Sequence, residues 1–170
     1  MKLSQNALEH LSLIGILGQI RFIPRYRLKV IMAQSLTESG FFKGGPTTYY
    51  TRSNNTNAFG MGYNQRGYAT GYFRTGTGEK WAIYPNFGQA VLDRFAWDNT
   101  RPKNKPNPSE STDQDDYINR LRLCGYWVEN GRDRGYTAII ESLLKKYDSD
   151  FNFCLNTPLI FMVSAFLFLK

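Results

Sequence analysis

One carboxylate stands alone in a long stretch of this sequence. Glu38 lies in the segment Ile31–Phe41, in the last turn of a predicted apolar helix that ends at Gly40. No other acidic residue occurs from Ser39 to Gly78, a stretch with four basic residues and many aromatic ones. A single carboxylate that faces an aromatic, basic surface is typical of a general acid in a cleft that binds a sugar polymer.

The predicted position of Glu38 favours a protonated carboxyl group. The C-terminal end of a helix is the negative end of its dipole, which disfavours an ionised carboxylate. The rings of Phe41, Phe42 and Phe59 are expected to exclude water from it. Both effects would raise the pKa of Glu38, as a general acid that works near neutral pH requires. The alternative is a glutamate that caps the helix or faces solvent, as most surface glutamates do.

Length and composition indicate one globular domain with a basic, aromatic surface. The chain has 170 residues, of which 42% are hydrophobic and 21% charged, and this excludes wholesale disorder. Its 11 Tyr and 12 Phe exceed what a small core needs, so some are expected on a surface that stacks on a ligand. The net charge of +7 favours an acidic partner: nucleic acid, an anionic membrane or bacterial cell wall. Nucleic acid is disfavoured, because Lys and Arg are spread along the chain and no nucleic-acid motif is present.

The sequence predicts no metal site and no cofactor. Its two cysteines, Cys124 and Cys154, and its one histidine, His10, lack the spacing of metal ligands. Two free, partly buried thiols are favoured over a Cys124–Cys154 disulfide, which stays open as an alternative. We interpret His10 as an ordinary helix residue.

Helix caps and hydrophobic periodicity predict a mostly helical chain. Predicted helices begin at Ser4, Pro24, Asn86 and Thr112, and a further helix is expected around 136–147. The stretch 63–84 predicts a β-hairpin that turns at Gly76-Thr77-Gly78, and 99–111 predicts an exposed loop.

The C-terminal segment differs in character from the rest. The pattern of a folded domain closes near Tyr147, so we predict a domain over 1–148 and an apolar tail over 149–170. The apolar run 159–169 is shorter than the roughly 20 residues that span a bilayer. A tail that associates with a membrane and a tail that folds onto the domain are therefore both open. No signal peptide is predicted, because the apolar run 11–17 is short and Glu9 precedes it.

Four blocks of the sequence resemble the glucosaminidase-type peptidoglycan hydrolases, family 73 of the glycoside hydrolases, within the lysozyme-like superfamily. In chain order these are Ala33-Gln34-Ser35-Leu36-Thr37-Glu38-Ser39-Gly40, then Asn57-Ala58-Phe59-Gly60, then Trp81-Ala82-Ile83-Tyr84, then Gly125-Tyr126 followed by Tyr136. The resemblance covers roughly residues 5 to 148 and implies an α+β, mostly α fold: a lysozyme-like helical domain with a small β-hairpin beside the cleft.

The resemblance also implies an activity and a set of site residues. It implies cleavage of β-1,4 glycosidic bonds in the glycan strands of peptidoglycan, with Glu38 as the catalytic acid. The implied substrate-binding residues are Asn57, Phe59, Gly60, Tyr63, Tyr84 and Tyr126.

The chain departs from the family in its second catalytic group. Many members carry a second acid on the hairpin strand after the N-x-F-G block, and Glu79, after the predicted turn, is the nearest candidate here. If Glu79 cannot reach the site, the N-acetyl group of the substrate or a water held by a tyrosine could attack instead. A lytic transglycosylase or muramidase reaction is also compatible, as is a wall-binding virion structural protein without turnover. A basic wall hydrolase with an apolar tail suggests a bacteriophage protein, located in a virion or on the periplasmic or cell-wall side. The C-terminal tail is the candidate membrane anchor.

Overall fold

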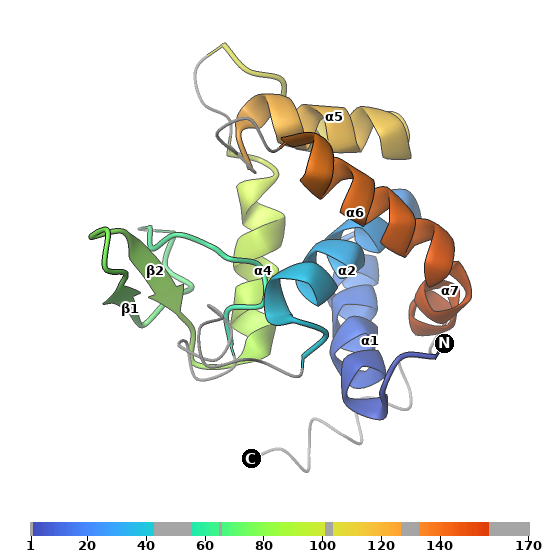
Figure 1. The fold of residues 1–170 in the computed structure, drawn as a ribbon, viewed down its shortest axis with the longest axis horizontal. Helices are drawn as coiled ribbons and strands as arrows, with labels where there is room; N and C mark the ends of the chain where they lie inside the picture. The colour runs from blue at the N-terminus through green and yellow to red at the C-terminus, as the bar shows by residue number, and fades with distance from the viewer. Residues whose placement is uncertain (1, 43–55, 65, 101–103, 127–132, 157–170) are drawn as a thin grey trace.

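The computed structural model describes residues 2–42, 56–64, 66–100, 104–126 and 133–156. The described part is mostly helical, with one small antiparallel hairpin at its side (Figure 1). In chain order its elements are α1 (Gln5–Ile20), α2 (Arg25–Ser39), β1 (Gly71–Arg74), β2 (Lys80–Ile83), α4 (Phe87–Trp97), η1 (Pro108–Glu110), α5 (Gln114–Cys124), α6 (Asp133–Lys146) and α7 (Asp148–Asn156). This architecture confirms the fold class predicted from the sequence.

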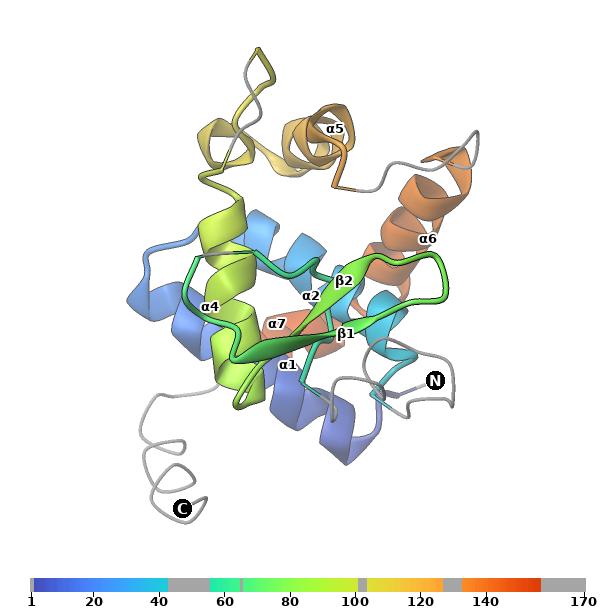
Figure 2. The ribbon, with the colours of Figure 1, turned by 90° about the vertical axis from the view of Figure 1, so that its left-hand side faces the viewer.

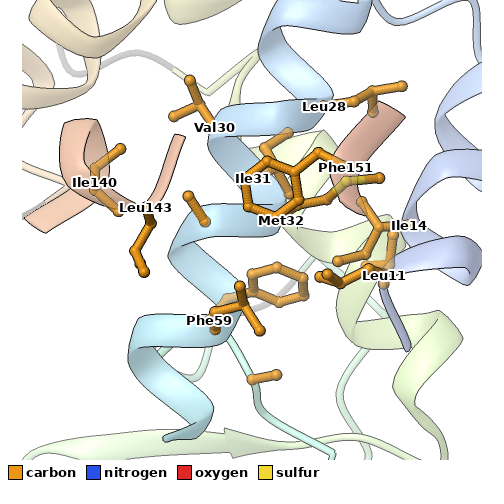
Figure 3. Close-up of a cluster of buried hydrophobic side chains, with 14 of the residues drawn as sticks. Leu11, Ile14, Leu28, Val30, Ile31, Met32, Phe59, Ile140, Leu143 and Phe151 are labelled. Atoms are coloured by element: carbon orange, nitrogen blue, oxygen red, sulfur yellow. The ribbon is translucent and has the colours of Figure 1, made fainter. Parts of the chain in front are cut away.

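Helix α2 runs through the centre of the molecule. Leu28, Ile31, Met32 and Leu36 on this helix have no exposed surface, and they pack against α1, α6 and α7 (Figure 3). A helix that is apolar on most sides can be stable only when other elements surround it. The central position of α2 therefore holds its last turn, which carries Glu38, in a fixed place.

Two glycines allow the helices to approach α1 closely. A Cβ atom at Gly18 would lie 2.2 Å from the Leu28 side chain of α2, and one at Gly15 would lie 2.9 Å from the Cys154 carbonyl of α7. Real Cβ atoms do not approach other atoms so closely, so a larger residue at either position would push the helices apart.

The cap residues agree with the sequence in three places and differ in one. Ser4 and Asn86 accept hydrogen bonds from the amides of Ala7 and Gln89, as predicted. Gly40 ends α2 in the left-handed conformation, as predicted. The N-cap of α5 is Asp113, which accepts from the amide of Asp116, and not the predicted Thr112. Aspartate caps a helix at least as well as threonine does, so residue type does not favour Thr112 over the residue that follows it.

The hairpin lies at one side of the helices and is extended by a neighbouring loop. Strands β1 and β2 pair in antiparallel register, with Tyr72 opposite Ala82, and the connection includes the predicted turn at Gly76–Gly78. Residue Gly62 forms an isolated bridge with Trp81, which places the loop after the N-x-F-G block along the free edge of β2.

The C-terminal helix extends the folded body beyond the predicted boundary at residue 148. Helix α7 packs on α1, and its Phe151, Cys154 and Leu155 side chains are buried. The first part of the predicted tail therefore contributes to the core, while residues 157–170 lie outside the described residues. No described helix is both long and apolar enough to span a bilayer. Cys124 and Cys154 are free, buried thiols, in agreement with the favoured prediction.

Candidate active site

Glu38 lies in the last turn of α2, and its side chain is half-buried. The amides of Gly40 and Phe41 donate to the carbonyls of Thr37 and Leu36, and these bonds close the helix. Glu38 is therefore at the negative end of a helix dipole, as predicted from the sequence.

The backbone immediately after Glu38 is strained. Gly40, Phe41 and Phe42 have φ values of 60°, 60° and 56°, although bulky residues rarely adopt the left-handed region. The conformation is held in place by Ser39, whose Oγ accepts from the Phe42 amide at 2.9 Å, and by the His10 ring, which stacks on Phe42 at 4.4 Å. Strained backbone costs free energy and persists only where the surrounding contacts hold it, and it is found often at functional sites. The His10 contact agrees with the structural role predicted for that residue.

Tyr136, in the first half of α6, contacts the carboxylate of Glu38. Its hydroxyl donates to Glu38 Oε1 at 2.8 Å, across 98 positions of sequence. Burial and the nearby Glu38 carboxylate raise the pKa of Tyr136 well above its ordinary value, so the tyrosine stays a neutral donor. A hydroxyl that donates to a carboxylate favours the ionised form. The effect of Tyr136 is therefore opposite in sign to the helix-end effect predicted from the sequence.

A hollow of about 320 Å³ lies between the hairpin, α4 and the end of α5. Four aromatic side chains contribute to its wall together with the backbone of the N-x-F-G block and two polar side chains. Its lining consists of Gly60, Met61, Gly62, Tyr63, Asn64, Arg66, Trp81, Trp97, Gly125 and Tyr126. None of these residues carries a carboxylate. The hollow is thus aromatic and free of carboxylates, and its one basic residue, Arg66, is paired with Asp93.

Tyr126 connects the hollow to Glu38. Its hydroxyl donates to the Phe59 carbonyl at 3.0 Å, and its ring packs edge-on against Trp97 at 4.7 Å. Burial raises the pKa of Tyr126 above its ordinary value, and the Glu38 carboxylate adds to this increase. Glu38 therefore acts electrostatically on a residue of the hollow, although it is not itself among the lining residues.

A buried polar network lies behind Tyr126. Arg94 of α4 is fully buried, and its guanidinium lies 4.4 Å from the centre of the Tyr126 ring. It donates to Gln34 Oε1 at 2.8 Å and forms an ion pair with Asp98, which also accepts from Arg27 and from the Tyr117 hydroxyl. Gln34 is one helical turn before Glu38, so this network fixes both the helix that carries Glu38 and the ring of Tyr126.

Asn57 of the N-x-F-G block fixes the floor of the hollow. Its amide group donates to the carbonyls of Met61 and Ala82 and accepts from the Met61 amide, all at 2.9–3.0 Å. Gly60 has a φ of 58°, a conformation that favours glycine. These features explain physically why the block has an asparagine and a glycine at this spacing.

Three of the predicted substrate-binding residues lie in the interior. The side chain of Asn57 is buried, and the Phe59 ring is buried and stacks on Phe87 at 6.0 Å. Tyr84 is also buried and donates to Asp93 Oδ2 at 2.6 Å. These side chains support the hollow from beneath and do not line it, because their polar groups and rings are already used in internal contacts.

The other predicted binding residues, Gly60, Tyr63 and Tyr126, do line the hollow. Trp97 was missed by the sequence analysis, and Tyr136 was noted only as part of a matching block. The signal available for Tyr136 was an aromatic residue at the start of an amphipathic helix, which core packing explains equally well.

Glu79 is exposed and lies immediately before β2 at the hairpin turn. Its Oε2 accepts a long hydrogen bond from Thr77 at 3.4 Å, within the same turn. The hairpin turn and the last turn of α2 are well separated in Figure 1, so this conformation does not bring Glu79 to Glu38. Among the described residues there is also no group of three or more His, Cys, Asp or Glu that could hold a metal ion.

Two solved structures share the fold of this chain. The catalytic domain of the autolysin Auto from Listeria monocytogenes aligns with a TM-score of 0.56 and 16% identity, over 87% of this chain and 86% of that one. A C-terminally truncated glycoside hydrolase domain of FlgJ from Salmonella typhimurium aligns with a TM-score of 0.56 and 19% identity, over 85% and 97%. By sequence, the chain matches no family model and no curated protein. The similarity therefore shows that this chain shares its fold with these two domains.

Proposed function

We propose that this protein is a glycoside hydrolase that cleaves the glycan strands of peptidoglycan, with Glu38 as the general acid. The observation that carries the proposal is the position of Glu38: half-buried at a strained helix end, bonded to Tyr136 and electrostatically coupled to the aromatic hollow. The fold shared with an autolysin catalytic domain and a glycoside hydrolase domain supports the same reaction class.

The hollow has the composition of a sugar-binding site. Sugar rings present apolar faces that stack on aromatic side chains, and Tyr63, Trp81 and Trp97 offer such surfaces. Arg66 and Asn64 supply polar groups at the same wall. Arg66 is held by Asp93, whose carboxylate also accepts from Tyr84.

In the proposed reaction Glu38 gives its proton to the oxygen of the scissile glycosidic bond. The leaving sugar departs with that proton, and positive charge develops on the ring that remains. Tyr136 then stabilises the carboxylate that Glu38 has become, because its neutral hydroxyl donates to Oε1. The tyrosine thus lowers the free energy of the product state of the proton transfer.

The group that attacks the developing cation is proposed to come from the substrate or from water. None of the residues that line the hollow is acidic, and Glu79 lies at the hairpin turn. Paired carboxylates in glycosidases are about 5 Å apart for retention and about 6.5–9.5 Å for inversion. An attack by the N-acetyl group of the substrate, by a water, or by a sugar hydroxyl in a transglycosylase reaction requires only one protein carboxylate.

Digestion of purified peptidoglycan, followed by mass spectrometry of the products, tests the proposal. The wild-type protein should release soluble fragments from the sacculi. The Glu38→Gln variant should bind the sacculi but release no fragments. Reducing-end GlcNAc indicates a glucosaminidase, reducing-end MurNAc a muramidase, and anhydro-MurNAc a transglycosylase. Absence of any product from the folded wild-type protein would favour a wall-binding protein and contradict the proposal. The two similar domains come from bacteria, so the bacteriophage origin predicted from sequence context stays a prediction.

A further inference from the structure

The end of the molecule opposite to Glu38 exposes an unusual group of apolar side chains. Among the described residues, the three most exposed large hydrophobic side chains are Phe22 at 93%, Phe153 at 63% and Ile20 at 53%. Ile20 is the last residue of α1, and Phe22 lies two residues later in the connection to α2. Phe153 lies in the last turn of α7.

Hydrogen bonds bring these two segments together. Gln19 donates to the Leu155 carbonyl at 2.6 Å, and Arg25 donates to Asn156 Oδ1 at 2.9 Å. Phe153 is one helical turn before Asn156, so its side chain lies on the same part of the α7 surface. We call this group the basal patch and define it as Ile20, Arg21, Phe22, Arg25 and Phe153.

Core packing does not explain Phe22. It is almost fully exposed, and its φ of 54° lies in the left-handed region that bulky residues avoid. A glycine or an asparagine would occupy this turn with less strain. An exposed, strained phenylalanine is therefore better explained by a contact outside the chain than by the stability of the fold.

The charge of the basal patch selects an anionic partner. Arg21 and Arg25 belong to it, and a hollow of about 430 Å³ beside it is lined by Arg21, Phe22 and the buried Arg27. No residue that lines this hollow carries a carboxylate. Arg27 and Arg94 share the single carboxylate of Asp98, which leaves positive charge behind the hollow. Phosphate groups match both the charge and the bidentate geometry of arginine.

The last described helix, α7, ends at the same place. Asn156, the last residue of α7, is bonded to Arg25. The 14 residues that follow in the sequence, 157–170, are apolar except for Thr157, Ser164 and Lys170. Apolar side chains beside arginines, next to the start of an apolar segment, form the pattern of an interfacial membrane anchor. A surface patch and an apolar segment each bind a membrane weakly, but the two together can attach a protein stably.

We propose that the basal patch docks on an anionic phospholipid bilayer. Ile20, Phe22 and Phe153 enter the boundary between headgroups and acyl chains, and Arg21 and Arg25 contact lipid phosphates. Glu38 is 13 residues from Arg25 along α2, which corresponds to about 20 Å at the rise of an α-helix. Figure 2 shows the α1–α2 connection and the last turn of α2 on opposite sides of the molecule, so the candidate active site faces away from the lipid.

Flotation of the full-length protein with lipid vesicles tests this proposal. Vesicles of phosphatidylcholine with phosphatidylglycerol should carry the protein, and vesicles of phosphatidylcholine alone should carry much less. Phe22→Asn should weaken partitioning about tenfold or more, because a large apolar side chain is lost while the left-handed turn is retained. Arg21→Gln should weaken it about fivefold on the anionic vesicles only, as expected for one arginine near the surface.

Matched controls come from other exposed positions. Leu123 is 45% exposed at the end of α5, and Arg122 is its exposed neighbour. Leu123→Ser and Arg122→Gln should leave partitioning unchanged, and thermal unfolding should confirm that all four variants are folded.

Two outcomes would overturn the proposal. In the first, Phe22→Asn and Arg21→Gln bind vesicles as the wild type does, while deletion of 157–170 abolishes vesicle binding. The segment 157–170 would then bind the bilayer without the basal patch. If a soluble polyanion binds the patch and vesicles do not, the partner is an acidic polymer and not a bilayer. Lysis of peptidoglycan in the absence of lipid should be unchanged in the patch variants, so failure here is distinguishable from failure of the proposed reaction.

Discussion

Two polar clusters on helix α2 lie one helical turn apart and differ in burial and in the charge of the groups around their carboxylates. At Gln34 the helix contacts a fully buried network in which Arg94, Arg27 and Tyr117 surround the carboxylate of Asp98. At Glu38 the carboxylate is half-buried and accepts a bond from the neutral hydroxyl of Tyr136. The Asp98 carboxylate is paired with two guanidinium groups, whereas the only contact described above for the Glu38 carboxylate is with a neutral hydroxyl.

The difference indicates a division of roles along one helix. Buried charges surrounded by complementary donors maintain a defined packing, because removal of one partner leaves an uncompensated charge. A general acid needs access to its substrate and a protonation state that changes during the reaction. We therefore expect substitutions at the Asp98 cluster to affect stability and substitutions at Glu38 to affect activity.

The largest expected effect is that of Glu38→Gln on turnover. Loss of a general acid should lower kcat by about 10²–10⁴-fold. The amide oxygen of Gln can still accept from Tyr136, so the free energy of unfolding should change by less than about 1 kcal/mol. Release of soluble fragments from sacculi and thermal unfolding measure the two quantities. Glu141→Gln, at an exposed position of α6, is the matched control, and near-wild-type lysis by Glu38→Gln would reject the assignment.

The second prediction concerns stability. Arg94→Met removes one of the two guanidinium groups that neutralise Asp98, and we expect a loss of about 3–5 kcal/mol in the free energy of unfolding. Chemical denaturation measures this change. Arg122→Met, at an exposed position of α5, should change it by no more than about 0.5 kcal/mol. An Arg94→Met protein that is as stable as the wild type would show that the cluster is not structural.

A smaller effect is expected for Tyr136→Phe, which should change the pH dependence of the reaction. The Tyr136 hydroxyl stabilises ionised Glu38, so its removal keeps the acid protonated to higher pH. The basic limb of the pH–rate profile should move upward by about one to two pH units, as a hydrogen bond to a charged group implies. Tyr26→Phe loses a tyrosine hydrogen bond to the Ser111 carbonyl instead, and its profile should match that of the wild type. An unchanged basic limb in Tyr136→Phe would contradict the proposed role of Tyr136.

The smallest effect is expected for Glu79→Gln. Glu79 is exposed at the hairpin turn, so its substitution should reduce kcat by far less than the ~10²-fold expected for loss of a catalytic carboxylate. The same lysis assay as for Glu38 applies. Equal inactivation by the two substitutions would show that the hairpin closes on the substrate and that two carboxylates participate.

Local sequence signals determined most of the elements. Ser4, Asn86 and Gly40 have side chains or backbone freedom that suit helix ends, and each has this role in the structure. The hairpin and its turn also follow from residue type, because Gly76 and Gly78 interrupt two alternating segments. Glu38 was located at a helix end by the same local reasoning.

Tertiary structure alone decided which side chains meet. The bond between Tyr136 and Glu38 joins positions 98 residues apart, and Arg94 lies beneath Tyr126 from a different helix. The close approach at Gly15 and Gly18 brings α7 and α2 onto α1, and Gln19 at the end of α1 bonds to the Leu155 carbonyl at the end of α7. Helix caps and turns depend on neighbours within a few residues, so the sequence reveals them directly. Contacts between distant helices depend on how complete surfaces pack together, and no short pattern of residues encodes that packing.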